Sequence, residues 1–357
     1  MKPSYSTHVY ALPAASIRIL FVTTALLLSP QLGYTHDARD HFNRALELTK
    51  IGNISEAREQ VEQAIANFPR FADAHHLLGV IQFRQSPHSQ QAVASLTQAT
   101  KLNPNFAKAY YDLGITLITH ERLEEATKAL RKAFTLYPGY WEAQLILAKL
   151  NEQTQAFEQA KEGYKAVLST KPKQAEALYS LAYLFHQDNQ TDQARSLLSQ
   201  LTESHPQHAD GWHLLGRIAE RAFQIPTAID AYQKAIAVHP EHIKAHYDLG
   251  ALYQYQNQPL EALAQFEAVT RLAPQEAEAR VNLGVLFAGN GQLDKAEHAY
   301  VKALELDPKL VEAHYNLGTF YEFHRKDTTR ALSHYQQYLK LGGKDQRIQK
   351  LVKQVSQ

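Results

Sequence analysis

Large apolar residues recur at steps of three and four along most of the chain, which is the spacing of one face of an α-helix. In one representative stretch, a first helix is marked by Tyr247, Leu249, Leu252 and Tyr253, and a second by Leu263, Phe266 and Val269. Gly250 and Ala262 are small where these two helices must approach closely. Pro259 suits the first turn of the second helix, because its missing N–H is not needed there. The pattern predicts pairs of packed helices.

The same pair recurs with a period of 34 residues, apart from a first step of 35. One series is proline, at Pro69, Pro104, Pro138, Pro172, Pro206, Pro240, Pro274 and Pro308. A second is alanine, twelve residues before each proline, at Ala57, Ala92, Ala126, Ala160, Ala194, Ala228, Ala262 and Ala296. A third is a Leu-Gly or Leu-Ala pair that begins at Leu78, Leu113, Leu147, Leu181, Leu215, Leu249, Leu283 and Leu317. One pair cannot bury its apolar face alone, so nine units over about residues 38–343 are predicted to stack as a solenoid.

These series resemble the tetratricopeptide repeat pattern, W-x₂-L-G-x₂-Y…A-x₃-F…P. The seventh unit carries it as His246, Leu249-Gly250, Tyr253, Ala262, Phe266 and Pro274, and the sixth as Trp212, Leu215-Gly216, Ala219, Ala228, Tyr232 and Pro240. The resemblance implies an all-α fold: a right-handed superhelical solenoid of about nine helix-turn-helix repeats. It also implies a concave surface that is lined by the first helix of each pair.

Three units depart from the pattern. The first has Arg44-Ala45 in place of the Leu-Gly pair, which fits an atypical terminal repeat. The second has one extra residue, expected in the loop around 86–88. The ninth has one extra residue, expected near 327–329, and Gly343 stands where its proline should be. We expect the array to continue through all three units.

The segment 344–357 follows the predicted array, which occupies residues 36–343. One helical face is marked by Ile348, Leu351, Val352 and Val355, and another by Lys344, Arg347, Lys350 and Lys353. This pattern predicts a C-terminal capping helix that seals the last repeat. The alternative is a basic patch for an acidic partner or an anionic surface.

Residues 1–35 have the layout of a secretory signal peptide. They contain no Asp or Glu, and an apolar run of ten residues follows Arg18. Pro30 and Gly33 come after it as helix breakers. The run is too short to span a bilayer, which needs about 20 residues. We expect export to the periplasm or another extracytoplasmic space, with an uncleaved membrane anchor as the alternative.

Two adjacent positions on the first helices are the candidate binding residues. The first position carries a tyrosine in every second unit, at Tyr111, Tyr179, Tyr247 and Tyr315, and the next position carries Asp112, Asp248, Asn282 and Asn316 among others. Tyrosine combines a rigid ring with a polar tip, and an amide can both donate to and accept from a bound backbone. These eight residues are predicted to contact partner segments on the concave face. The alternative is that the rings pack between repeats and the polar groups tie adjacent hairpins together.

Composition adds several exclusions. A net charge of +1 argues against non-specific nucleic-acid binding, and the absence of Cys excludes disulfides and thiolate metal sites. The 18 histidines suggest a metal site, but the pairs His75-His76 and His242/His246 each lack a third ligand in the sequence pattern. His246 and His314 occupy a repeat position that elsewhere holds Trp212, which indicates packing. We predict no metal, no cofactor and no catalytic residues.

Repeats and cap account for almost everything after residue 37, so the sequence predicts a protein that is not an enzyme. The expected function is a protein–protein interaction scaffold or adaptor in the cell envelope, with protein or peptide segments as partners. Membrane contact is expected only through the N-terminal segment, if it is uncleaved. One alternative is an accessory subunit that binds a glycan or another ligand for a separately encoded enzyme. Another is a cytoplasmic adaptor that is anchored by its apolar N-terminal segment.

Overall fold

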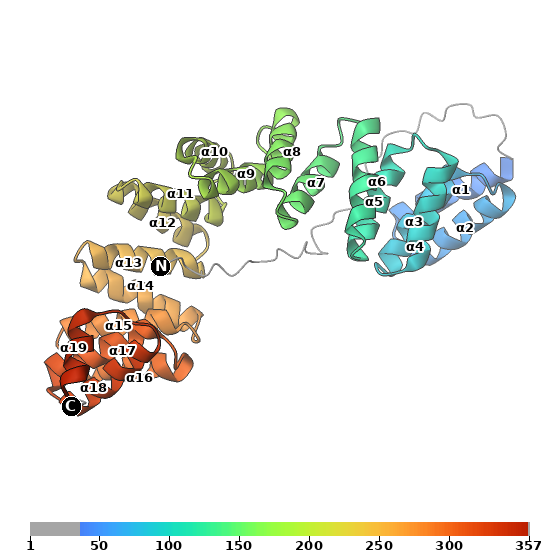
Figure 1. Ribbon diagram of the computed structural model, residues 1–357. Helices are drawn as coiled ribbons and strands as arrows, with labels where there is room; N and C mark the ends of the chain where they lie inside the picture. Colours follow the sequence, from blue (N-terminus) through green and yellow to red (C-terminus); the bar gives the residue numbers. More distant parts are fainter. Residues whose placement is uncertain (1–35, 356–357) are drawn as a thin grey trace. The chain divides into compact units, whose positions relative to one another are not determined.

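The computed structural model describes residues 36–355, in which all regular structure is helical (Figure 1). The chain divides into two compact units between residues 184 and 185. Their described residues are 36–184 and 185–355. The predicted N-terminal leader lies outside the described residues. None of the described helices has the length and apolar composition needed to cross a membrane.

Unit 1 contains four helix pairs and most of a ninth helix. Its helices are α1 (His36–Lys50), α2 (Ile54–Asn67), α3 (Ala72–Gln85), α4 (Gln90–Leu102), α5 (Ala107–Thr119), α6 (Leu123–Leu136), α7 (Trp141–Gln153), α8 (Phe157–Thr170) and α9 (Ala175–Gln187), which crosses into unit 2. Each odd-numbered helix from α1 to α7 packs on the helix that follows it, and each even-numbered helix from α2 to α6 packs on the next pair.

Unit 2 repeats this arrangement. Its helices are α10 (Thr191–Ser204), α11 (Ala209–Arg221), α12 (Ile225–Val238), α13 (Ile243–Tyr255), α14 (Pro259–Leu272), α15 (Ala277–Gly289), α16 (Leu293–Leu306), α17 (Val311–Phe320), a π-helical turn η2 (Tyr321–Arg325), α18 (Thr328–Lys340) and α19 (Gln346–Val355). Packing within and between consecutive pairs follows the pattern of unit 1. The described helices thus form eight packed pairs, the consecutive helices α9 and α10, and a terminal helix, which confirms the predicted all-α repeat array.

Small residues let the two helices of a pair approach closely, as predicted. The alanine series is fully buried throughout, and Ala331 takes the same role in the ninth pair. A Cβ placed on Gly284 would lie 2.5 Å from the ring of Tyr300, and one on Gly216 would lie 2.6 Å from the ring of Tyr232. Glycine in the Leu-Gly pair therefore makes room for the large side chain of the second helix.

Many histidines serve this packing. His246 Nε2 donates a 3.0 Å hydrogen bond to the carbonyl of Pro240, six residues earlier. The same bond to a preceding proline carbonyl is made from His75, Trp212, Arg280 and His314. The predicted packing role of His246 and His314 is confirmed. The bond also satisfies a backbone acceptor in the turn between repeats, where no helical N–H reaches it.

The two extra residues are absorbed in different ways. In the second repeat, four residues (86–89) join α3 to α4 where three (120–122) join α5 to α6, so the extra residue lies in the predicted loop. In the ninth repeat it does not lie at 327–329. The π-helical turn η2 holds the extra residue instead, since a π turn has one more residue than an α turn, and it ends at the left-handed Lys326 (φ 57°).

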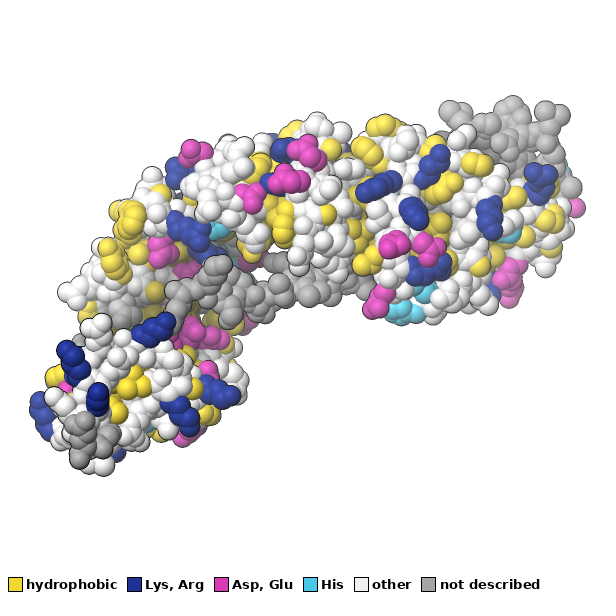
Figure 2. Space-filling view, in the orientation of Figure 1, with side chains coloured by type: hydrophobic (Ala, Val, Ile, Leu, Met, Phe, Trp, Pro, Cys, Tyr) yellow, Lys and Arg dark blue, Asp and Glu magenta, His cyan; other side chains and the backbone are white. Residues whose placement is uncertain are grey.

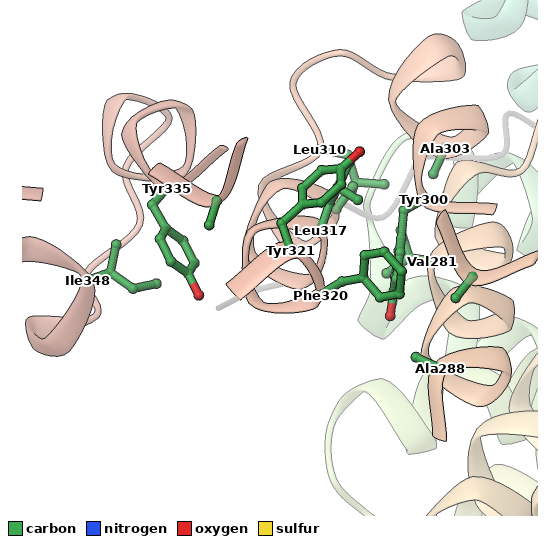
Figure 3. Close-up of a cluster of buried hydrophobic side chains, with 13 residues drawn as sticks. Val281, Ala288, Tyr300, Ala303, Leu310, Leu317, Phe320, Tyr321, Tyr335 and Ile348 are labelled. Carbon is green, nitrogen blue, oxygen red and sulfur yellow. The ribbon is translucent and has the colours of Figure 1, made fainter. Parts of the chain in front are cut away.

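The last helix caps the array. Ile348 of α19 is fully buried beside Tyr335 of α18, and Leu351 and Val352 pack partly against the same cluster (Figure 3). On the basic side, Arg347 forms a 2.9 Å ion pair with Glu322, and its guanidinium lies 5.6 Å from the Tyr335 ring centroid. Val355 stays exposed. The predicted cap is therefore confirmed, and one of its basic residues serves to hold it in place.

Candidate partner-binding face

The first helices of consecutive repeats contact one another. In unit 1, α3 contacts α5, and in unit 2, α11 contacts α13. Side chains at the same position of successive first helices therefore form a row along one face of each unit. On the side of the molecule shown in Figure 2, Lys and Arg side chains are interspersed with Asp and Glu. The candidate residues lie on these first-helix rows.

In unit 2 a tyrosine hydroxyl is held from the next repeat. The Tyr247 hydroxyl in α13 donates to Glu278 Oε2 and accepts from Asn282 Nδ2, both in α15 and both at 3.3 Å. Its ring meets the ring of Phe266 edge-on, with centroids 5.6 Å apart. Burial, with the neighbouring Glu278 carboxylate, raises the pKa of Tyr247 to about 12. Tyr247 and Asn282 are half-buried, so part of each side chain reaches the surface in a fixed orientation.

Asp248 joins the same helix to the preceding repeat. Its Oδ2 accepts a 2.8 Å hydrogen bond from Nε2 of the buried His213 in α11, and its side chain keeps 30% of its exposure. The His213 ring also lies 4.9 Å from that of His242, which in turn bonds to Asp210 at 3.2 Å. Burial lowers the pKa of His213, although the bond to Asp248 opposes that shift.

Tyr315 and Asn316 lie at the end of this row, on α17. The Tyr315 ring is 5.4 Å from that of Tyr338, at an angle of 56°. Asn316 donates from Nδ2 to the backbone carbonyl of Glu312 at 2.8 Å, within its own helix. Both residues are half-buried. This bond therefore does not join Asn316 to another repeat.

In unit 1, Asp112 differs from the other candidates because it is buried. Its side chain keeps 4% of its exposure, and Oδ2 accepts a 2.6 Å hydrogen bond from His76 Nε2 in α3. This contact is the alternative that the sequence left open, a polar group that ties adjacent hairpins together. Asp112 is therefore left out of the proposed contact surface.

The tyrosines of unit 1 stack on further tyrosines. The Tyr111 ring lies parallel to Tyr140, with an interplanar angle of 6° and centroids 5.3 Å apart, and Tyr137 meets Tyr140 edge-on. Burial raises the pKa of both stacked tyrosines above the ordinary range, and the carboxylates of Asp112 and Glu142 add to this. Tyr179 stacks on Tyr183 of the same helix at 6.4 Å.

The sequence predicted Asn282 but did not identify the other residues that hold the predicted ones. His76 and His213 occupy the tyrosine position of their own repeats, and each bonds to the carboxylate of the next repeat. Asn282 bonds to Tyr247 in the same way. The signal was available as a spacing one residue longer than the local repeat step, which is 36 residues for His76 and Asp112 and 35 for the other two pairs. In the described part of the chain, no group of three or more His, Asp or Glu residues is arranged to hold a metal ion.

Family models described as "Tetratricopeptide repeat" match most of the chain. One matches residues 42–86, 88–140, 111–166, 247–309 and 284–345, and another matches 153–218. No curated protein matches the sequence.

Solved structures with the same fold are only distantly similar in sequence. The C-terminal part of a TPR repeat-containing protein from Cytophaga hutchinsonii is 16% identical, with a TM-score of 0.56 over 68% of this chain and 99% of that one. PilF from Pseudomonas aeruginosa is 23% identical, with a TM-score of 0.50 over 58% and 95%. MamA from Desulfovibrio magneticus RS-1 is 24% identical, with a TM-score of 0.44 over 47% and 94%.

The helix pairs, the buried alanine and glycine series and the matches to the family models agree over residues 42–86, 88–218 and 247–345. The chain belongs to the tetratricopeptide repeat family, whose fold is a scaffold for protein–protein interaction.

Proposed function

We propose that this protein is a non-enzymatic scaffold of the cell envelope, and that it binds extended protein segments along the first-helix rows. The residues proposed for contact are Tyr111, Tyr179, Tyr247, Asp248, Asn282, Tyr315 and Asn316. Binding would be spread over many modest contacts rather than a single deep pocket, because half-buried tyrosine, amide and carboxylate groups recur along the rows.

The observation that supports this proposal most strongly is the fixed position of Tyr247. Glu278 and Asn282 hold its hydroxyl, and Phe266 supports its ring. A ring that is already fixed loses little conformational freedom when a partner packs on it, so more of the contact energy appears as affinity. Tyrosine is also enriched among the residues that dominate protein interfaces.

The envelope location rests on residues 1–35, which combine a basic start, an apolar run and helix breakers. The test is a fusion of these residues to a phosphatase reporter that is active only outside the cytoplasm. We expect activity from the fusion, and none when an aspartate is placed within the apolar run. Reporter activity that is absent from the unmodified fusion would place the scaffold in the cytoplasm instead.

Partner binding is tested by photo-crosslinking in cells from a benzoylphenylalanine at position 247, followed by mass spectrometry. The control position is Glu267, which is exposed on the second helix α14. Discrete protein adducts from position 247 but not from position 267 are expected. Equal adducts at both positions, or none at either, would contradict the proposal. Oligosaccharide binding to the purified chain, lost in Tyr247→Ala, would instead favour the glycan-binding accessory subunit.

A further inference from the structure

Two repeats, one in each unit, share a phrase that no other repeat carries. Residues 108–114 read Lys-Ala-Tyr-Tyr-Asp-Leu-Gly, and residues 244–250 read Lys-Ala-His-Tyr-Asp-Leu-Gly. The third and seventh repeats are thus nearly identical over these seven positions of the first helix, although the intervening repeats differ. Tyr111 and Tyr247, the proposed contact residues, lie at the same position of the two phrases.

The contacts around the two phrases match as well. In unit 1, His76 bonds to Asp112 at 2.6 Å, and its ring lies 4.9 Å from that of Phe106. In unit 2, His213 bonds to Asp248 at 2.8 Å, and its ring lies 4.9 Å from His242, the counterpart of Phe106. The same His–Asp contact is therefore built twice from residues in equivalent positions, whereas the ring of Tyr111 stacks on Tyr140 and that of Tyr247 meets Phe266 edge-on.

A glutamate follows each of these tyrosines by 31 residues, in the first turn of the next first helix. Glu278 accepts a 3.3 Å hydrogen bond from the Tyr247 hydroxyl. Glu142 lies close enough to the Tyr111 and Tyr140 stack for its charge to raise their pKa values. No hydrogen bond or ion pair joins Glu142 to another side chain among residues 36–355, and it is only half-exposed.

Neither Glu142 nor Glu278 forms an ion pair among residues 36–355. Lys108 and Asp112 are four residues apart on α5, as Lys244 and Asp248 are on α13. Each aspartate also accepts a hydrogen bond from a histidine of the preceding repeat. What remains is a carboxylate beside the face or edge of a half-exposed tyrosine. A planar guanidinium fits this pair best, because it stacks on an aromatic ring and bonds to a carboxylate at the same time.

We propose that the surfaces around Tyr111/Glu142 and Tyr247/Glu278 are two sites at equivalent repeat positions, one in each unit, and that each binds an arginine side chain of a partner segment. This proposal rests on the proposed function and narrows it. A partner with two arginine-bearing motifs, or two copies of one partner, would occupy both sites. Binding of a two-motif partner would then exceed the affinity of either motif alone, provided that its linker spans the two sites.

The test is amide NMR of the full chain titrated with the capped tripeptide Ser-Arg-Ser. The matched probe is Ser-citrulline-Ser, which keeps the shape of arginine and lacks its charge. We expect shifts around both Tyr111 and Tyr247, with binding of the citrulline peptide about tenfold weaker. Glu142→Gln should abolish the shifts in unit 1 and leave those in unit 2, and Glu278→Gln should do the opposite. Glu267→Gln is the control and should change neither.

Equal binding of the two peptides would overturn the proposal, as would shifts that are confined to one unit or unaffected by both glutamine variants. These outcomes are distinguishable from failure of the proposed function. If position 247 still crosslinks to a protein in cells while the arginine peptide does not bind, the scaffold function stands and only the arginine specificity fails.

Discussion

Asp112 of α5 and His76 of α3 share a buried 2.6 Å hydrogen bond across two consecutive repeats. The same relationship joins Asp248 to His213, and Asn282 to Tyr247. In each case the polar residue bonds to the side chain one position earlier in the preceding repeat. The polar row on the first helices therefore has two roles, since it links the hairpins and presents the groups that remain exposed.

The linking role predicts that Asp112→Ala destabilises the fold. The change leaves the buried His76 without its acceptor, which should lower the free energy of unfolding by about 1–3 kcal/mol. Asn316→Ala is the matched change at the same repeat position, where the side chain is half-exposed and bonds only within its own helix. It should change stability by less than about 0.5 kcal/mol. Urea unfolding followed by circular dichroism measures both, and equal losses would argue against a structural role for Asp112.

The close approach of paired helices predicts opposite outcomes for two glycines of α15. Gly284→Ala places a Cβ 2.5 Å from the Tyr300 ring, whereas a Cβ on Gly289 meets nothing within 4 Å. Alanine gains more helix propensity in the helix interior at Gly284 than at the last helical residue Gly289, so a lower stability of Gly284→Ala reports the steric clash. Gly284→Ala should be less stable than Gly289→Ala by about 1–3 kcal/mol. Indistinguishable melting curves would contradict the helix contact described here.

The bond from His246 to the Pro240 carbonyl predicts that a donor matters at this position. His246→Phe keeps a ring but removes the bond to Pro240 and the 2.8 Å contact of Nδ1 with Gln265, and should cost about 1 kcal/mol of stability for each. His246→Trp should recover the loss that belongs to the Pro240 bond, because Trp212 makes the equivalent 2.9 Å bond to Pro206. Chemical denaturation compares the two variants. If Phe is as stable as Trp, the position serves packing alone.

The buried histidines predict a loss of stability in acid. Burial, with His314 adjacent, lowers the pKa of His334 to about 4, below the ordinary value of 6.5. The folded state therefore takes up this proton less readily than the unfolded chain. Its contribution to stability is complete above about pH 6.5 and is lost as the pH falls through 6.5 towards 4.

His334→Phe keeps a ring stacked on Tyr321 and cannot titrate. Its stability should fall less steeply than that of the wild type between pH 6.5 and 4. The exposed His298 on α16 is the control, and His298→Phe should leave the slope unchanged. Thermal melting across this pH range makes the comparison. A His334→Phe profile parallel to that of the wild type would assign the acid sensitivity to other groups.

The fold was largely predictable because the same residue types recur at the same positions of each repeat. Proline, alanine and glycine recur at fixed spacing, so even weak signals such as that of Gly284 were reinforced by their counterparts. The extra residue of the ninth repeat was the exception, since a π turn has no composition signal and the nearby Asp327 and Thr328 suggested a loop.

The site was less predictable, because its residues act across repeats. The row that contains Tyr247 and Asp248 could be recognised from spacing. Which residues of the row are buried depends on the side chains of the adjacent repeat. Only the structure shows that Asp112 accepts a hydrogen bond from His76. It also shows that Glu278 and Asn282 bond to the Tyr247 hydroxyl. A pattern that compares positions within a repeat does not contain these pairings.

The π turn Tyr321–Arg325 has a consequence for how such an array can change. One residue added to an α-helix rotates the later residues of that helix by about 100°, which would change where the chain leaves the first helix and with it the position of Ala331 and Tyr335 in α18. Here the added residue widens a single turn, and both side chains remain buried. Single-residue insertions at this point are thus tolerated without loss of phase, and the last repeat and its cap stay aligned with the units before them.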